Sequence, residues 1–119
     1  MDYLFQLQHI GINESNEEEA RRVTAFLHAV FGFPLRETSS AIFANEQIEI
    51  MKSPGRGRLG HFAVGTSDVA KAQLFLESQG ISFDESSASY NVAGEKIVIY
   101  AREELSGFAW HLIKRPETP

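Results

Sequence analysis

The sequence predicts an α+β domain in which one βαβββ unit occurs twice. Two segments open alike, His9-Ile10-Gly11-Ile12 near the start and His61-Phe62-Ala63-Val64 past the middle. Each is followed by a segment with helical periodicity and then by short stretches that suit strands. Each half closes on an apolar strand with one ionisable residue at its centre, Ile48-Glu49-Ile50 and Trp110-His111-Leu112. Because the same order of elements recurs, we expect curved mixed sheets that together form a cleft.

The length and composition suit a single folded domain. The chain has 119 residues, 43% of them hydrophobic and 23% charged, which is enough for one hydrophobic core. We assign residues 1–54 to the first unit and residues 55–119 to the second. The net charge of −5 argues against a general affinity for nucleic acid. The sequence holds no cysteine, so disulfides and thiolate metal sites are excluded.

The first unit begins with an alternating segment that predicts a strand over Phe5–Asn13. Ser15 or Asn16 can cap the helix that follows, and the acidic residues after them favour the positive end of its dipole. Gly32 is a natural end for this helix. Three short strands are predicted after it, over Leu35–Thr38, Ala41–Ala44 and Gln47–Lys52, with a hairpin turn at Asn45-Glu46.

The second unit repeats this order. A strand is predicted over Gly60–Thr66, and Ser67 or Asp68 caps a helix that stops at Gly80. The polar stretch from Ser86 to Gly94 predicts a loop or a frayed sheet edge. The remaining strands are predicted near Ser82–Asp84, Lys96–Arg102 and Phe108–Lys114, and a disordered tail is expected after Lys114.

Four ionisable side chains occupy equivalent places in the two units: His9 and His61 in the opening strands, Glu49 and His111 in the closing ones. The period of two in a strand sets them opposite the apolar face, which the helices must cover. A lone carboxylate in so hydrophobic a strand is costly unless it is paired or binds a cation. Three imidazoles and one carboxylate suit a divalent transition-metal ion. We therefore predict that these four side chains hold one such ion.

Each of these residues also has a simpler interpretation. A histidine in a strand is more often a hydrogen-bonded structural residue than a ligand, and His111 could be half-exposed on an open sheet. Glu49 could form an ion pair with Arg36 or Lys52. The agreement of four equivalent positions is what favours the metal site. His28 lies within the first predicted helix, and we interpret it as a helix-flank residue rather than a ligand.

These residues and their order resemble the vicinal oxygen chelate superfamily, which includes glyoxalases, extradiol dioxygenases, and bleomycin- and fosfomycin-resistance proteins. The resemblance covers His9 to Lys114 and implies a glyoxalase-like fold, in which each module supplies one ligand from its first strand and one from its last. The bacterial glyoxalase pattern is His, Glu, His, Glu, so this chain departs from it at His111. With Glu49 as the only carboxylate ligand, the ion would be a stronger Lewis acid, and glyoxalase I activity itself is not expected.

A closer resemblance is to a module attached to some bacterial keto-hydroxyglutarate/keto-deoxyphosphogluconate aldolases. It rests on the strings HIGIN, EEEA, FGFP, SSAIFA, IEIMKSP, LGHFAVGT, GISFDE and GFAWHLIKR. The Schiff-base lysine of those aldolases belongs to their barrel, so the resemblance implies no aldolase activity here. It implies a small anionic 2-oxo acid of sugar-acid catabolism as substrate, whose two adjacent oxygens can chelate one ion. Its carboxylate or phosphate could meet one of four arginines, each by itself an ordinary surface residue: Arg36, Arg56, Arg58 and Arg102.

Together these features predict a metal-dependent enzyme of isomerase or lyase type that acts on a 2-oxo acid or a sugar acid. Glu49 would serve as the base, and Tyr100, on a strand that could line the cleft, as the proton donor. The ion could be Ni, Co, Mn, Zn or Fe. The alternative is a non-catalytic module that binds or sequesters a small ligand, as an accessory to a sugar-acid aldolase. Dioxygenase chemistry ranks lowest, because a fourth ligand at His111 leaves fewer positions for oxygen and substrate.

The resemblance also implies a homodimer, because clefts in this superfamily are often completed between subunits. An aldolase is the other partner considered. Whether the four side chains converge within one chain or across two is open at this point. We see no secretory signal and no apolar segment long enough to cross a bilayer, so a cytoplasmic protein is expected.

Overall fold

The computed structural model describes residues 4–115. In chain order their elements are β1 (Gln6–Asn13), α1 (Glu17–Phe31), β2 (Leu35–Glu37), β3 (Ala41–Ala44), β4 (Ile48–Met51), β5 (Gly60–Thr66), α2 (Val69–Ser78), β6 (Phe83–Tyr90), β7 (Lys96–Ala101) and β8 (Phe108–Lys114). Apart from Arg115, the tail predicted after Lys114 falls outside the described residues. Within residues 4–115, no helix is both long and apolar enough to span a membrane.

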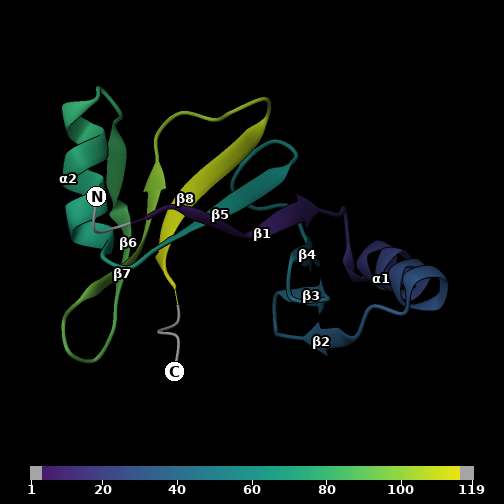
Figure 1. The fold of residues 1–119 in the computed structure, drawn as a ribbon. Coiled ribbons are helices and arrows are strands. Elements are labelled where there is room, and N and C mark those ends of the chain that lie inside the picture. The colour runs from purple at the N-terminus through teal and green to yellow at the C-terminus, as the bar shows by residue number, and fades with distance from the viewer. Residues whose placement is uncertain (1–3, 116–119) are drawn as a thin grey trace.

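The eight strands form one mixed sheet in the order β2-β3-β4-β1-β5-β8-β7-β6 (Figure 1). Within each half the first strand runs parallel to the last, β1 to β4 and β5 to β8. The two halves meet where β1 and β5 pair antiparallel. Both halves thus have the same strand order when read from their outer edges, and the predicted α+β class is confirmed. A division into modules between residues 54 and 55 stays a prediction.

Both helices start at residues that were predicted to cap them. The Asn16 side chain accepts a hydrogen bond from the Glu19 amide (2.9 Å). The Asp68 side chain accepts one from the Lys71 amide (3.0 Å) in the same way. α1 ends at Gly32, whose φ of 72° is in the left-handed region that glycine adopts most easily. Because these signals are local, the start of both helices and the end of α1 could be predicted from the sequence, whereas α2 ends at Ser78, before the predicted Gly80.

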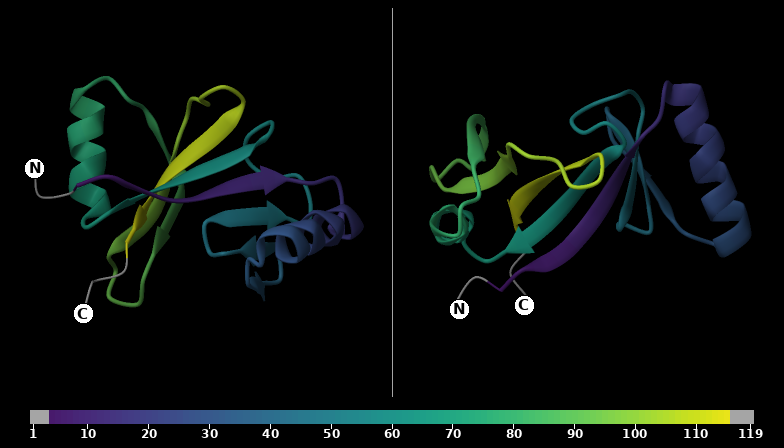
Figure 2. Two further views of the ribbon diagram at one scale, coloured as in Figure 1. Left: turned by 45° about the vertical axis from the view of Figure 1, so that its right-hand side comes forward. Right: turned by 90° about the horizontal axis from the view of Figure 1, so that it is seen from above.

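The two helices pack near the two ends of the sheet (Figure 2). The face opposite to the helices is left open at the middle of the sheet. α2 packs on β7 and β8, where Ile99 and Leu112 are fully buried. α1 packs on β3 and β4, where Ile50 is fully buried. Burial of such a side chain is worth about 1.5–3 kcal/mol. Because neighbours in a strand point to opposite faces, this packing turns His111 and Glu49 toward the open face.

β6 is longer than expected. The structure extends it to Tyr90, whereas the sequence predicted a strand near Ser82–Asp84 and a loop or frayed edge from Ser86. The prediction of a loop is therefore wrong for the residues up to Tyr90. The alternative prediction of a frayed sheet edge is confirmed, because β6 is an outer strand with an irregular register. The Ser87 hydroxyl accepts a hydrogen bond from the Tyr100 amide (2.9 Å). In a regular strand pair a main-chain carbonyl would be the acceptor of this bond. Small polar side chains can thus continue a strand that hydropathy does not reveal.

β1 is interrupted at Gln8. The register passes from Leu7 opposite Val64 to His9 opposite Ala63, so Gln8 is an extra residue without a partner of its own. The unbroken alternation predicted along this strand is therefore wrong at Leu7, which lies on the face opposite to His9. Such a bulge bends the strand locally and re-aims the side chains on either side of it.

Candidate metal centre

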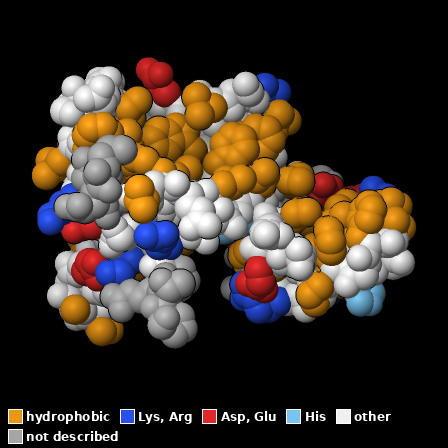
Figure 3. All heavy atoms as spheres, viewed as in Figure 1, with side chains coloured by type: hydrophobic (Ala, Val, Ile, Leu, Met, Phe, Trp, Pro, Cys, Tyr) orange, Lys and Arg blue, Asp and Glu red, His pale blue; other side chains and the backbone are white. Residues whose placement is uncertain are grey.

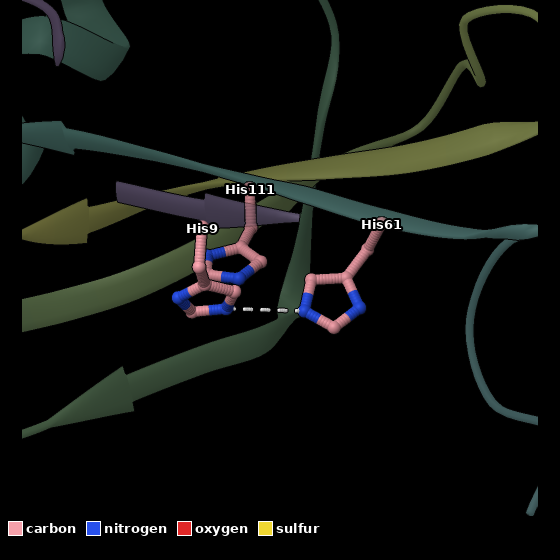
Figure 4. Close-up of side chains that lie close together, drawn as sticks. All are labelled: His9, His61 and His111. Carbon is pink, nitrogen blue, oxygen red and sulfur yellow. Dashed lines mark hydrogen bonds between the residues drawn. The ribbon is translucent and has the colours of Figure 1, made fainter. Parts of the chain in front are cut away.

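Three histidines from three neighbouring strands meet on the open face of the sheet (Figure 4). His9 comes from β1, His61 from β5 and His111 from β8. One ring nitrogen of each lies within 4.8 Å of those of the other two, and the Nε2 atoms of His9 and His61 are 3.3 Å apart. All three belong to one chain, so this cluster forms without a second copy.

The sheet register explains why the three rings converge. Ala63 on β5 is the partner of His9 on one side and of His111 on the other. His61 lies two residues earlier on the same strand and therefore on the same face. The small side chain of Ala63 leaves the space above it to the imidazoles of the flanking strands. The position of the cluster is thus set by paired strands rather than by loops.

Glu49 on β4 joins the cluster beside His9 and His61. Its Oε1 atom lies 3.0 Å from the Nε2 atom of His61 and 3.3 Å from that of His9. Burial opposes ionisation of this carboxyl, but hydrogen bonds from the two imidazoles outweigh it and hold the pKa of Glu49 at about 2. Glu49 therefore carries a negative charge at neutral pH, directly beside two imidazoles.

His111 is buried, with 5% of its surface exposed, so the interpretation of a half-exposed residue is wrong. Burial lowers the pKa of His111 to about 4, because the imidazolium would lose its hydration. Its Nδ1 atom lies 3.1 Å from the carbonyl oxygen of Leu112, which can only accept, so Nδ1 carries the proton. The Nε2 lone pair is therefore available to a ligand at neutral pH. A backbone carbonyl that fixes the tautomer in this way is common behind metal-binding histidines.

The donor set fits a divalent transition-metal ion. Imidazole nitrogens that share one ion at about 2 Å lie roughly 3–4 Å from one another, close to the spacing of the cluster. Metal binding requires deprotonated ligands, and the ionised Glu49 and neutral His111 meet that requirement. Small side-chain shifts would bring the imidazoles to a common ion. The same contacts also describe a hydrogen-bonded cluster in which Glu49 pairs with His9 and His61.

Aromatic rings on the strands next to β4 and β8 line the cluster. Tyr100 is the partner of His111 across β7 and β8, with ring centroids 4.7 Å apart. Phe43 holds the corresponding place opposite Glu49 on β3, and its ring centroid lies 5.5 Å from that of His9. Burial raises the pKa of Tyr100, so its hydroxyl keeps the proton at neutral pH. The structure brings Tyr100 to the cluster and adds Phe43, which hairpin register could have indicated.

Two of the four candidate arginines flank the cluster. The guanidinium carbon of Arg36 lies 4.4 Å from the Phe43 ring centroid, and that of Arg56 lies 4.7 Å from the Tyr100 ring centroid. Because β3 and β7 lie on opposite sides of the central strands, the two cations stand on opposite sides of the histidines. Arg36 forms its ion pair with Glu46 and not with Glu49. The alternative in which Glu49 forms an ion pair with Arg36 is therefore wrong.

Three other residues considered from the sequence lie apart from the cluster. Arg58 is exposed beside Gly107, and Arg102 is exposed beyond the end of β7. Within residues 4–115, neither forms a hydrogen bond or an ion pair with the four candidate ligands. His28 is exposed on α1, where its Nδ1 atom lies 2.9 Å from the Phe33 carbonyl oxygen, as expected for a helix-flank residue.

A groove of about 590 Å³ opens beside His9. Figure 3 shows the molecule hollowed between its two ends on the lower side. The walls of the groove combine apolar side chains with two cations, each of which is paired with a carboxylate, Arg36 with Glu46 and Lys114 with Glu95. Such mixed walls suit a small molecule with both a polar and an apolar part. The residues that line it with His9 include Arg36, Phe43, Glu46, Ile113 and Lys114.

Comparison with known proteins shows a likeness of fold. No family model matches the chain, and no curated protein matches it. A hypothetical protein from Bacillus halodurans superposes with a TM-score of 0.65, at 18% identity over 97% of both chains. Methylmalonyl-CoA epimerase from Streptomyces coelicolor, in complex with 2-nitronate-propionyl-CoA, gives a TM-score of 0.64, at 15% identity over 94% of this chain and 98% of that one.

A second epimerase structure agrees with the first. Methylmalonyl-CoA epimerase in complex with methylmalonyl-CoA and NH4+ gives a TM-score of 0.64, at 16% identity over 98% of this chain and 99% of that one. The chain shares the fold of these neighbours over nearly its whole length, so the predicted glyoxalase-like fold is confirmed. The finer resemblance to the aldolase-attached module stays a prediction.

Proposed function

We propose that the chain is a metal-dependent enzyme of the vicinal oxygen chelate superfamily, of isomerase or lyase type, that acts on a small chelating 2-oxo acid or sugar acid. The observation that carries this proposal is the convergence of three imidazoles on the open face of a single chain, with the ionised carboxylate of Glu49 beside two of them. The fold likeness supports it, because an epimerase is itself an isomerase. The identity of the acid comes from the sequence resemblance alone.

His9, His61, His111 and Glu49 would hold the divalent ion, which supplies Lewis-acid polarisation of a bound oxygen. Glu49 is ionised at neutral pH, so it has a free lone pair with which to accept a proton. Its shortest contacts with the imidazoles both use Oε1, so Oε2 is the oxygen that can turn toward a substrate. Tyr100 can donate a proton because its hydroxyl is protonated at neutral pH and its ring lies against that of His111. A carboxylate base and a phenol donor beside the same pair of oxygens are what enolisation of a 2-oxo acid needs.

The test is proton exchange at carbon 3 of a 2-oxo acid. Protein stripped with a chelator is supplied in turn with Ni²⁺, Co²⁺, Mn²⁺, Zn²⁺ or Fe²⁺ and incubated in D₂O with pyruvate or 2-oxobutyrate, with the free ion as control. NMR should show deuterium entering faster with one loaded form than with the ion alone. Exchange that is indifferent to chelator, in a protein that takes up no stoichiometric ion, would contradict the proposal.

The second candidate is a module that binds a small anion without chemistry, alone or as an accessory to a sugar-acid aldolase. The contacts of Glu49 with His9 and His61 favour it, because they satisfy these groups when no ion is bound. The groove beside His9 would then take the ligand. Calorimetric titration with 2-oxo acids, with and without metal, separates the candidates. Tight binding that is independent of metal and gives no turnover would favour this module over the enzyme.

The assembly and location of the protein also belong to this proposal. A homodimer and a cytoplasmic location are expected from the resemblance and from the composition. The three imidazoles converge within one chain, and Glu49 of the same chain contacts two of them, so the proposal does not require a dimer to bring these side chains together. Sedimentation analysis of the purified chain tests the dimer, and addition of a sugar-acid aldolase to the same sample tests the other partner.

A further inference from the structure

We propose that Arg56 forms an anion-binding subsite next to the histidine cluster, and that it selects substrates with a second anionic group remote from their chelating oxygens. This inference rests on the proposed function and narrows its substrate to 2-oxo acids that are dianions. Arg56 lies on the connection between β4 and β5, outside the strands that carry the candidate ligands. Its role would therefore be to recognise substrate and not to hold the ion.

Arg56 is held beside the cluster by two contacts. Its guanidinium carbon lies 4.7 Å from the ring centroid of Tyr100, which lies 4.7 Å from that of His111. Its Nη2 atom donates a hydrogen bond to Oδ2 of Asp84 on β6 (3.0 Å). Asp84 accepts further hydrogen bonds from Ser86, and these bonds together with that from Arg56 lower the pKa of Asp84 to about 2. Asp84 thus stays charged near neutral pH and keeps Arg56 over the ring.

The loop that carries Arg56 is fixed by close packing of its backbone. Gly57 has a φ of 84°, and a Cβ on it would overlap the carbonyl oxygen of Gly60 and lie 2.6 Å from the amide nitrogen of Ala109. The Asn13 side chain donates a hydrogen bond to the Gly57 carbonyl (2.9 Å). The backbone next to Arg56 is therefore attached to β1 and lies against β8. A pre-positioned guanidinium loses less freedom on binding an anion than one on a mobile loop.

Arg56 has N–H groups that can still bind an anion, whereas the Nε and Nη2 groups of Arg36 already bind a carboxylate. A guanidinium has five N–H groups, and within residues 4–115 Arg56 is recorded giving one hydrogen bond, to Asp84. Arg36 directs its Nε and Nη2 atoms at both carboxylate oxygens of Glu46, each at 2.7 Å. This is the paired geometry in which an arginine binds a carboxylate, so Glu46 fills the place that a substrate would take. Of the two arginines at the cluster, Arg56 is the one equipped to bind a second anion.

A dianionic substrate can use both places at once. Its chelating end belongs at the histidines, and its distal carboxylate or phosphate belongs at Arg56. His111 and Arg56 each contact the ring of Tyr100 rather than each other, so a substrate that reaches both needs several atoms between its two ends, as in a 2-oxo dicarboxylate. Hydrogen bonds between charged partners are stronger than neutral ones, so we expect a preference of about tenfold or more for the dianion.

The test compares 2-oxo acids that differ only in the distal group. 2-Oxoglutarate and 2-oxoadipate carry a distal carboxylate, and 2-oxopentanoate and 2-oxohexanoate carry a methyl group in its place. In calorimetric titrations of protein loaded with Co²⁺, the wild type should bind the dicarboxylates about tenfold more tightly or better. Arg56→Gln should abolish this preference and leave Co²⁺ affinity nearly unchanged. Arg22→Gln, which removes an equal charge from the exposed side of α1, should keep the preference.

Other outcomes would overturn the subsite. One is that the preference for dicarboxylates survives in Arg56→Gln, and a second is that it is lost in Arg36→Gln but not in Arg56→Gln. A third is that the wild type binds both kinds of acid equally. Titration with Co²⁺ alone measures the metal affinity of the protein independently of the acids. If the ion does not bind, the proposed function fails. The same acids titrated into the metal-free protein then still show whether Arg56 selects a distal carboxylate.

Discussion

The imidazole of His61 occupies the space where a side chain on Gly11 would lie. The two residues face each other across β1 and β5, and a Cβ on Gly11 would overlap Cε1 and Nδ1 of His61 and lie 2.7 Å from its Nε2 atom. Gly11 is not among the residues with positive φ, so its requirement for glycine is one of space and not of backbone conformation. The missing side chain is what lets His61 point toward His9 and His111.

We predict that Gly11→Ala displaces the His61 ring and weakens metal binding by about 10–100-fold, as loss of a positioning contact typically does. The fold should survive, because a side chain can move where a backbone cannot. Calorimetric titration with Co²⁺ measures the affinity, and circular dichroism checks the fold. Gly55→Ala is the matched control, since the nearest atom to its added Cβ is Oδ1 of Asn13 at 4.0 Å. Equal affinity in the two variants would contradict the role of Gly11.

Glu49→Gln should weaken metal binding by about 10–100-fold, because the amide keeps the shape of the side chain and removes the charge. The same change should stop deuterium exchange into a 2-oxo acid, since an amide does not accept the proton. Metal titration and NMR measure the two effects. Glu18→Gln on the exposed first turn of α1 removes an equal charge far from the cluster. If Glu49→Gln binds metal as the wild type does, the site consists of the histidines alone.

Tyr100→Phe should slow proton exchange by about 10²-fold or more while leaving metal affinity nearly unchanged, because it removes the hydroxyl and keeps the ring. The ring contacts with His111 and Arg56 are retained in this variant. Rates of deuterium entry, compared at equal metal occupancy, measure the effect. Tyr90→Phe on the exposed edge strand is the control. An unchanged rate in Tyr100→Phe would remove Tyr100 from the proposed chemistry.

The stabilising effect of Glu37 should depend on pH. Its carboxylate accepts hydrogen bonds from Arg21 and Lys52, which hold its pKa at about 2. Lys52, the other cation considered as a partner of Glu49, therefore pairs with Glu37. Because the folded pKa is below the unfolded one, the stabilisation is present above about pH 4.5 and is lost as the pH falls toward 2, where the unfolded chain takes up the proton first.

Glu37→Gln tests this dependence. The variant should unfold at a lower temperature than the wild type at pH 7, and the difference should shrink between pH 4.5 and pH 3. Its size should also fall with added salt, because Glu37 and Arg21 are largely exposed. Thermal unfolding monitored by circular dichroism measures both trends. A difference that stays constant from pH 7 to pH 3 would show that Glu37 acts through packing and not through charge.

The features of the fold that could be predicted depend on short stretches of sequence. Asn16 and Asp68 cap the helices within a few residues, and Gly32 ends the first one. The alternation in β4 and β8 is enough to predict that Glu49 and His111 lie opposite the face that the helices bury. That is why the candidate ligands could be named together from the sequence.

What could not be predicted depends on the pairing of distant strands. Only the register of β1 against β5 shows that His61 fills the space at Gly11, and only that register reveals the extra residue at Gln8. The choice between Arg36 and Arg56 likewise depends on carboxylates from other parts of the chain. Hydropathy gave no sign that Ser87 would replace a carbonyl in the ladder of β6 and β7. Each of these is a non-local contact with no periodic signature.

The most direct test of the account is an NMR titration of the histidine side chains with Zn²⁺. The chain has four histidines, and His28 on α1 is an internal control. In ¹⁵N-labelled protein, one equivalent of Zn²⁺ should move the ring-nitrogen signals of His9, His61 and His111 together and leave those of His28 unchanged. Signals that do not move, or that move for His28 alone, would contradict a metal centre built by these three strands.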